Sequence, residues 1–430
     1  MNEKLIPKPI NLTPQVSTIE LGVEIGPSLP PRTPQSHNCE QVVVDEVAFT
    51  DALRPQCQKR RLDEAQASPQ AKRQKEEQSA SESEESSSSE EEMESSVFEG
   101  KKLHDYQGRT YMHCDQEFRN KDLDHRCYIP KAHIHTWEGH KKAVTTIRFL
   151  PNTGHILLSA SLDNSVKLWD VNYDGRLLRT FSGHSLGVRD LCFNNDGSQF
   201  MTASYDGYVK LWDTETGQSH GRYKSGKRPN MVRIYPENEH EFLVSQDSNE
   251  IIQWDRRTNK IAMTYEGHLR PVKTITFIED GKQFVSTSTD KRMFVWDYGL
   301  PVVNKYMSDV DMPSVKYAAV SPDGSKYIGQ SSGGVMVYSI DRNGKFRPTG
   351  KKYSGHSSGG YACQVGFSPD GQFVISGSSN GYAVFWDAKK RKLYSRLQCH
   401  DKATVGCIWH PVFPSRVATC SWDGTIKLWD

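Results

Sequence analysis

Apolar and polar residues alternate along most of the chain after residue 130, in runs of about six residues. Two clear examples are VRDLCF at 188–193 and VKTITF at 272–277. Alternation with a period of two is typical of β-strands that bury one face. Turn sequences of the Asn-Asp-Gly or Pro-Asp-Gly type follow several such runs, at 195–197, 322–324 and 369–371. Asp and Gly suit the backbone angles of tight hairpins, so the pattern predicts an all-β fold built from short antiparallel strands.

A repeat organises these strands. The dipeptide Trp-Asp recurs with its Trp at positions 169, 212, 254, 296, 386 and 429, and Tyr338-Ser339 fills the gap. Successive intervals are 43, 42, 42, 42, 48 and 43 residues. Gly-His or Cys-His precedes the Trp by 28 to 30 residues, with its His at positions 140, 184, 268, 356 and 400. Residues 131–430 therefore resemble the WD-repeat family, and seven units imply a seven-bladed β-propeller.

The resemblance implies a buried hydrogen-bonded chain of four side chains in each regular unit: the His, a Ser or Thr, the turn Asp and the Trp. The expected sets are His140, Ser159, Asp163 and Trp169; His184, Thr202, Asp206 and Trp212; His268, Ser286, Asp290 and Trp296; and His400, Thr419, Asp423 and Trp429. Because the set repeats in register, we interpret it as a structural element and not as a Ser-His-Asp catalytic triad.

Three units depart from this pattern. The third lacks Gly-His and has its acid, Asp247, one residue early; the fifth lacks the His, the Asp and the Trp; and the sixth has Asn380 at the turn position. The long interval before the sixth Trp predicts a longer loop around residues 341–356.

The last unit contains only three strands after its His. We therefore expect HIHTW at 133–137 to pair with residues 425–429 as the fourth strand of that blade, which would close the ring and remove an exposed edge. On this basis the propeller domain begins near residue 131.

The preceding region differs in composition. Residues 1–130 carry 16 Lys and Arg against 24 Asp and Glu, whereas residues 131–430 carry 38 against 29. Residues 1–100 include the Ser/Glu tract at 79–96 and have little that could form a core, so we expect them to be disordered. The first tyrosines of the chain appear at 101–130, which we interpret as an arm that docks on the propeller or on a partner. The basic clusters Lys59-Arg60-Arg61 and Lys72-Arg73 with Lys75 resemble a bipartite nuclear localisation signal.

The sequence gives no support for a membrane or secreted protein, for a disulfide-rich or zinc-binding protein, or for an enzyme. No apolar run approaches the 18 or so residues of a membrane span, and no hydrophobic signal core is present, so we expect an intracellular protein without membrane association. The nine cysteines show no C-x-x-C pair, which argues against a disulfide framework or zinc site. No nucleotide-binding, kinase or hydrolase motif occurs. We expect no enzymatic activity, no cofactor, no metal and no small-molecule substrate.

The surface expected to bind partners is the one on which the His loops and the Asp turns meet, called the first face below. The residues following the His or preceding the Asp ring the mouth of the channel: Lys142, Leu162, Tyr205, Arg270, Thr289, Lys402 and Trp422. A basic ring interleaved with aromatic side chains suits an acidic peptide or an RNA strand.

Several segments carry a narrower resemblance, among them HDYQGRTYMH at 104–113, RCYIPKAHIHTWEGH at 126–140 and GGYACQVGFSPDG at 359–371. With KLYSRLQCHDKATVGCIWHP at 392–411, they resemble the pre-mRNA-processing factor seventeen family of spliceosomal WD-repeat proteins, the cell-division-cycle-forty homologues. This resemblance implies a nuclear, non-enzymatic scaffold for the second transesterification of splicing. Its partners would be proteins and snRNP components of the catalytically activated spliceosome, with direct RNA contact left open. The alternatives are a substrate adaptor of a ubiquitin ligase and a chromatin reader.

Overall fold

The computed structural model describes residues 94–101, 103–104, 106–114, 126–172, 175–278, 281–308, 312–341 and 346–430. The chain divides into two units, Met1–Ser68 and Pro69–Asp430, and all described residues belong to the second. The basic clusters at 59–75 lie outside the described residues, as do most of residues 1–100. No helix within the described ranges is long and apolar enough to cross a membrane.

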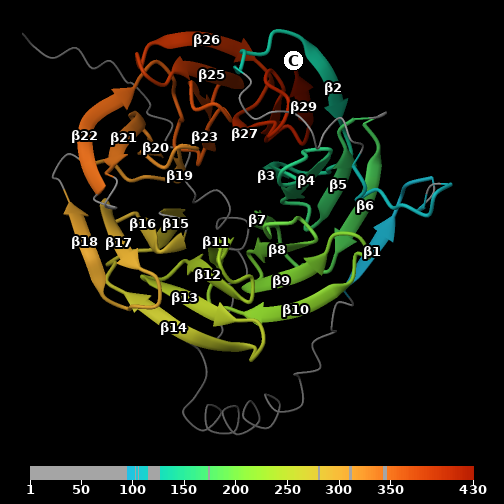
Figure 1. The fold of residues 1–430 in the computed structure, drawn as a ribbon, viewed down its shortest axis with the longest axis horizontal. Helices are drawn as coiled ribbons and strands as arrows, with labels where there is room; N and C mark the ends of the chain where they lie inside the picture. Colours follow the sequence, from blue (N-terminus) through green and yellow to red (C-terminus); the bar gives the residue numbers. More distant parts are fainter. Residues whose placement is uncertain are drawn as a thin grey trace, which may run out of the picture. The chain divides into compact units, whose positions relative to one another are not determined.

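Seven antiparallel sheets, here called blades 1 to 7, surround a central channel (Figure 1). This arrangement confirms the predicted all-β, seven-bladed propeller. The strands of blades 1 to 3 are β3 (Val144–Phe149), β4 (Ile156–Ser161), β5 (Val166–Asp170), β6 (Leu177–Ser182), β7 (Val188–Phe193), β8 (Gln199–Ser204), β9 (Tyr208–Asp213), β10 (Ser219–Lys224), β11 (Pro229–Ile234), β12 (Glu241–Gln246), β13 (Glu250–Asp255) and β14 (Lys260–Glu266). The strands of blades 4 to 6 are β15 (Val272–Ile278), β16 (Gln283–Ser288), β17 (Arg292–Asp297), β18 (Val303–Ser308), β19 (Tyr317–Val320), β20 (Lys326–Ser331), β21 (Gly334–Ile340), β22 (Phe346–Tyr353), β23 (Val365–Phe367), β24 (Phe373–Gly377), β25 (Tyr382–Asp387) and β26 (Leu393–Gln398).

Blade 7 is assembled from two distant parts of the chain. It contains β27 (Thr404–Trp409), β28 (Val417–Ser421) and β29 (Ile426–Trp429), and its outer strand is β2 (His133–Trp137). The register pairs His133 with Trp429 and Trp137 with Ile426. Trp137 is buried in the cluster that also holds Trp169, so β2 seals the junction between blade 7 and blade 1. The outer strand thus reaches blade 7 from immediately before the first His loop.

The core lies between neighbouring blades. The two central strands of each blade are almost wholly buried, as in ILLSAS of β4 and QFMTAS of β8. Outer strands are less buried, and in β26 half-buried and exposed positions alternate. Because each blade buries its central strands against the next, the described residues form seven apolar clusters around the ring, with a row of inner strands along the channel.

Two features differ from the sequence-based expectation. Ser95–Phe98, within the range expected to lack order, form β1, a fifth strand that pairs with β6 at the edge of blade 1. In addition, half of the range 341–356, where the sequence predicts a longer loop, forms the eight-residue strand β22. A register shift between Val337 and Tyr338 absorbs two of the extra residues, since Val337 pairs with Lys351 and Tyr338 with Pro348.

Candidate partner-binding face

Four side-chain tetrads tie the His loops to the Asp turns on the first face. In blade 1, His140 Nδ1 lies 2.9 Å from Asp163 Oδ2 and its Nε2 lies 2.8 Å from Ser159 Oγ. Trp169 Nε1 donates to the same Ser159 Oγ at 2.8 Å. The tetrad of blade 1 therefore forms as the repeat predicts, and it connects a surface loop to the buried third strand.

Blades 2, 4 and 7 contain the same chain of contacts. In each of them the His contacts both the turn Asp and the Ser or Thr, and the Trp indole donates to that same hydroxyl. The members are His184, Thr202, Asp206 and Trp212 in blade 2; His268, Ser286, Asp290 and Trp296 in blade 4; and His400, Thr419, Asp423 and Trp429 in blade 7. The structure thus brings together every side chain of the four predicted sets.

The carboxylates of these tetrads are stabilised in their charged form. Burial by itself would raise the pKa of Asp163, but hydrogen bonds from His140 and Ser165 outweigh it and hold that pKa well below the usual value. The pKa values of Asp206, Asp290 and Asp423 are lowered by the same balance, each with its own His as the main partner. An ionised turn Asp can then accept from backbone amides of the His loop, as Asp163 does from Lys141 N at 3.0 Å.

The irregular blades lack this connection. In blade 6, neither ring nitrogen of His356 has a hydrogen-bond partner among the described residues, and Trp386 Nε1 donates to the Ser354 carbonyl instead. In blade 3, Trp254 Nε1 likewise has no partner within the described ranges. The first-face loops of these two blades are therefore not tied to the third strand by a tetrad.

A second set of contacts positions the residues expected to bind partners. The residue before each turn Asp donates its backbone N–H to the carbonyl three positions after the His. The pairs are Leu162 to Ala143 at 3.0 Å, Tyr205 to Gly187 at 3.0 Å, Thr289 to Pro271 at 3.2 Å and Trp422 to Ala403 at 3.2 Å. Lys142 and Arg270 are held through their carbonyls, which accept from Ser161 Oγ and Ser288 Oγ. Lys402 lies in the His loop of blade 7, so all seven candidate residues lie on the first face.

They differ in exposure. Lys142, Arg270, Lys402 and Trp422 are exposed, whereas Leu162, Tyr205 and Thr289 are half-buried. Trp422 is 44% exposed and meets Tyr361 edge-on at 5.0 Å between ring centroids. The half-buried residues help to form the floor of this face, and the four exposed side chains are available to a ligand.

Sequence reasoning missed other exposed groups here. Leu186 and Leu269 are 45% and 68% exposed in the His loops of blades 2 and 4. Arg189 also belongs to this face, since its guanidinium lies over the Tyr205 ring at 5.5 Å. The two leucines directly follow or nearly follow a His, so their position was readable from the repeat. They give the first face an apolar component beside its basic one, a combination common where proteins bind one another.

The arm contacts the opposite side of the propeller, the second face, which carries the Asn/Pro-Asp-Gly turns. Tyr111 Oη donates to the carbonyls of Thr214 and Glu215 at 2.7 and 2.8 Å, and Arg179 Nε donates to it at 3.2 Å. Further along, Cys127 N donates to Asp370 Oδ2 at 2.7 Å in blade 6. Residues 115–125 between these contacts lie outside the description. The arm therefore docks near blades 1, 2 and 6.

Nothing in the described ranges forms a cluster of His, Cys, Asp or Glu suited to a metal ion. The alternating pair at 133 and 135 lies in β2, where His133 Nε2 contacts Thr136 Oγ1 at 2.8 Å and His135 packs on Trp137. Burial raises the pKa of the Cys127, Cys399 and Cys420 thiols to about 12 in each case. Thiols with such high pKa values are poor nucleophiles at neutral pH.

Comparison with known proteins agrees with this architecture. The WD domain, G-beta repeat family matches residues 131–170, 175–213, 259–297, 347–387 and 391–430, and the irregular third and fifth units fall between the matches. Pre-mRNA-processing factor 17 from Mus musculus and from Homo sapiens are each 43% identical over 344 residues, which cover 78% of this chain and 59% of theirs. The Saccharomyces cerevisiae protein of that name is 33% identical over 346 residues, covering 78% of this chain and 76% of its own. The chain thus spans about three fifths of the length of the mouse and human proteins.

Proposed function

The chain belongs to the pre-mRNA-processing factor 17 family, and from that premise we propose that it is a non-enzymatic scaffold of pre-mRNA splicing. Its first face and its arm would bind proteins and snRNP components of the activated spliceosome, in the second transesterification step. The family membership is the observation that carries this proposal. Because the chemistry would belong to other components, the role of this chain is to hold them in place.

The extent of the match supports a role for the arm. The 78% of the chain that aligns with the mouse protein is longer than the propeller itself, so part of the match lies outside residues 131–430. Generic propeller similarity would not require this. An arm shared within the family and docked on the second face is suited to reach a partner that the blades do not contact.

The chemistry of the first face supports protein binding. Trp422 and Leu269 supply exposed apolar area in blades 7 and 4, while Lys142, Arg270 and Lys402 supply positive charge in blades 1, 4 and 7. Aromatic and aliphatic anchors inside a charged rim are the usual composition of an energetically important interface. The basic rim also leaves direct contact with RNA open to test. The basic clusters at 59–75 support a nuclear location for the chain.

Affinity capture from nuclear extract at moderate salt tests the proposal. We expect tagged full-length chain to recover spliceosomal snRNAs together with second-step proteins. A double variant that combines Leu269→Ser with Trp422→Ala should lose most of this recovery, whereas Tyr394→Ala, which removes an exposed aromatic from β26, should not. Recovery of a cullin scaffold or of histones without snRNA would replace the proposal by a ligase adaptor or a chromatin reader.

The step of splicing needs its own experiment. Extract depleted of the chain should carry out the first transesterification and accumulate lariat intermediate and free 5′ exon. Adding back the full chain should restore exon ligation, and adding back the first-face double variant should not. Accumulation of unspliced precursor alone would place the chain before the first step and contradict the proposal.

A further inference from the structure

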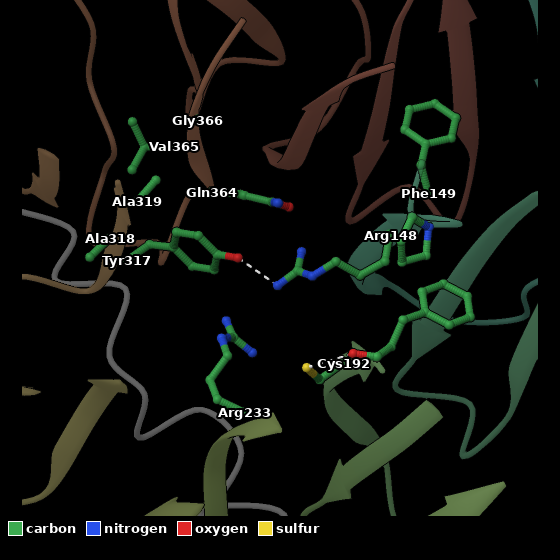
Figure 2. Close-up of a pocket in the computed structure, with 12 residues that line it drawn as sticks. Arg148, Phe149, Cys192, Arg233, Tyr317, Ala318, Ala319, Gln364, Val365 and Gly366 are labelled. Atoms are coloured by element: carbon green, nitrogen blue, oxygen red, sulfur yellow. Dashed lines mark hydrogen bonds between the residues drawn. The ribbon is translucent and has the colours of Figure 1, made fainter. Parts of the chain in front are cut away.

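A cavity of about 410 Å³ lies in the central channel, between the inner strands of blades 1, 2, 3, 5 and 6 (Figure 2). Its polar wall is made by Arg148, Arg233, Tyr317 and Gln364, whose functional groups face a common space. Arg148, Phe193 and Arg233 lie near the ends of their inner strands, whereas Tyr317 is the first residue of β19 and Gln364 directly precedes β23. The cavity therefore lies within the channel, and none of its lining residues belongs to the ring of candidate residues on the first face.

The charges around this cavity do not balance. Arg233 Nη1 donates to Asp190 Oδ2 at 2.7 Å, and Arg148 Nη2 lies 3.3 Å from Asp190 Oδ1. Asp190 is 5% exposed in its side chain and lies behind the wall; no acidic residue is among the twelve that line the cavity. Two guanidinium groups thus share one carboxylate, which leaves one net positive charge at the wall.

Hydrogen-bond donors also remain available there. Arg148 Nη1 and Arg233 Nη1 donate to the carbonyls of Ile147 and Val232. Tyr317 Oη accepts from Arg148 Nη2 at 2.6 Å. The hydrogen bonds of Arg233 to other described side chains and carbonyls are made by Nη1, and its side chain is 18% exposed, so Nε and Nη2 can reach a ligand. The buried Gln364 Oε1 has no partner within the described ranges. Because buried polar groups of native proteins are normally satisfied, this unpartnered amide oxygen indicates a polar ligand.

The apolar lining residues, the net charge and the volume of the cavity indicate which class of ligand fits it. Phe149, Pro151 and Phe193 form apolar wall around the polar part, which suits an aliphatic stem. One net positive charge matches a carboxylate, which carries one negative charge, better than a phosphate group, which carries nearly two. Carboxylates are also planar and pair with guanidinium groups through parallel hydrogen bonds. A volume of about 410 Å³ exceeds what a carboxylate needs and leaves room for the chain that carries it.

We propose that this cavity binds the carboxylate of a Glu or Asp side chain, presented by a segment of a partner protein that enters the central channel. The carboxylate accepts from Arg233 and from the Tyr317 hydroxyl, and the Gln364 amide contacts it or the adjoining backbone. The inference goes beyond the proposed function and does not depend on it, because it rests on the cavity alone.

Titration of the full chain with capped peptides tests the proposal. The probes are acetyl-Gly-Gly-Glu-Gly-Gly-amide and its Gln counterpart, with butyrate and inorganic phosphate as free anions, each followed by calorimetry or saturation-transfer NMR. We expect the Glu peptide to bind at least about tenfold more tightly than the Gln peptide, the difference of one charge-assisted interaction. Equal binding of the two peptides, or none at millimolar concentration, overturns the proposal. Tighter binding of butyrate or phosphate than of the Glu peptide overturns the assignment to a protein segment.

Two variants in the cavity and one control variant test whether the peptide binds there. Arg233→Met should weaken the Glu peptide at least about tenfold. Because this change also deprives Asp190 of a partner, Tyr317→Phe provides a milder test that keeps the ring and every charge and should weaken binding about threefold to tenfold. Arg222→Met is the matched control, since Arg222 lies over the Tyr208 ring outside the cavity. Unchanged affinity in folded Arg233→Met and Tyr317→Phe would show that the peptide binds elsewhere.

Discussion

Lys210 Nζ lies 2.7 Å from Glu94 Oε1, and this ion pair connects the central part of blade 2 to the residue that precedes β1. The side chain of Lys210 is 2% exposed and that of Glu94 is 21% exposed. Lys210 also donates to the Gly183 carbonyl, which places its ammonium group at the His loop of blade 2. Residues 94–98, which precede the arm, are thus held by charge as well as by the pairing of β1 with β6.

Replacing Glu94 by Gln should loosen β1. The change removes the ion-pair partner of the buried Lys210 ammonium and leaves Asp206 as its remaining nearby carboxylate, which we expect to cost about 1–3 kcal/mol of β1 docking. Amide hydrogen exchange at residues 95–98 should become faster while exchange in β8 and β9 changes little. Glu266→Gln, an exposed acid on β14, is the control and should leave β1 unaffected. Unchanged protection at 95–98 would mean that strand pairing alone holds β1.

A Ser→Ala substitution should cost more stability in a blade with a complete tetrad than in a blade without one. Ser159→Ala in blade 1 leaves both His140 Nε2 and Trp169 Nε1 without their shared partner, which should cost about 2–3 kcal/mol. Ser376→Ala in blade 6 is made at the equivalent position, ten residues before Trp386, but among the described residues Ser376 Oγ hydrogen-bonds only to the Gly377 carbonyl. It should cost about 1 kcal/mol or less. Chemical denaturation of both variants checks this, and equal losses would contradict a structural role for the complete tetrad.

Low pH should lower the unfolding free energy of the propeller, because the turn aspartates become protonated. The pKa values of Asp163, Asp206, Asp290 and Asp423 are lowered in the folded chain from an ordinary value of 3.8. As the pH falls, the unfolded chain therefore binds protons at these aspartates before the folded chain does. The stability that the four ionised aspartates contribute is complete above about pH 5 and is lost progressively below about pH 4. Unfolding free energies measured between pH 6 and pH 2.5 should decline in this window. Asp163→Asn should be less stable at neutral pH and show a shallower decline; an equally steep decline would exclude Asp163 as a contributor.

The thermal stability of the propeller should depend on whether a shortened chain still contains β2. A chain shortened to begin at Lys131 retains β2, whereas one that begins at Gly139 lacks it and exposes the edge of β29. Loss of Trp137 from the blade 7–blade 1 core should alone cost about 3–5 kcal/mol. We expect the shorter chain to melt at a markedly lower temperature and to aggregate. Comparable melting temperatures for the two chains would show that the ring does not need β2.

Much of the fold could be predicted because each unit carries its own signals. The period, the His loops and the strand alternation are all local, and HIHTW at 133–137 stands directly before the first His loop, where the other units have their outer strand. β1 could not be found in this way, because SSVF at 95–98 is too short to show a period and adjoins an acidic tract. Its order depends on the β6 edge and on Lys210, which are tertiary features.

The cavity could not be predicted from the sequence for a related reason. Arg148, Asp190 and Arg233 are 42 and 43 residues apart, so each is an ordinary polar position in a different inner strand. Tyr317, which contacts Arg148, lies 169 residues further along the chain. Only closure of the ring brings these side chains together. Leu186 and Leu269, in contrast, lie in the His loops, where the repeat places them and a search for exposed apolar residues would have found them.

The pairing of β2 with β29 also has a consequence for biosynthesis. Residues 133–137 leave the ribosome almost 300 residues before their partner strand, and until then blade 7 does not exist and the channel has an open side. Contacts between such distant segments form late and slowly, and unpaired strand edges in the meantime favour association with other chains. We therefore expect the nascent propeller to need protection by chaperones until β29 has emerged, more than a fold of the same size built from local contacts would.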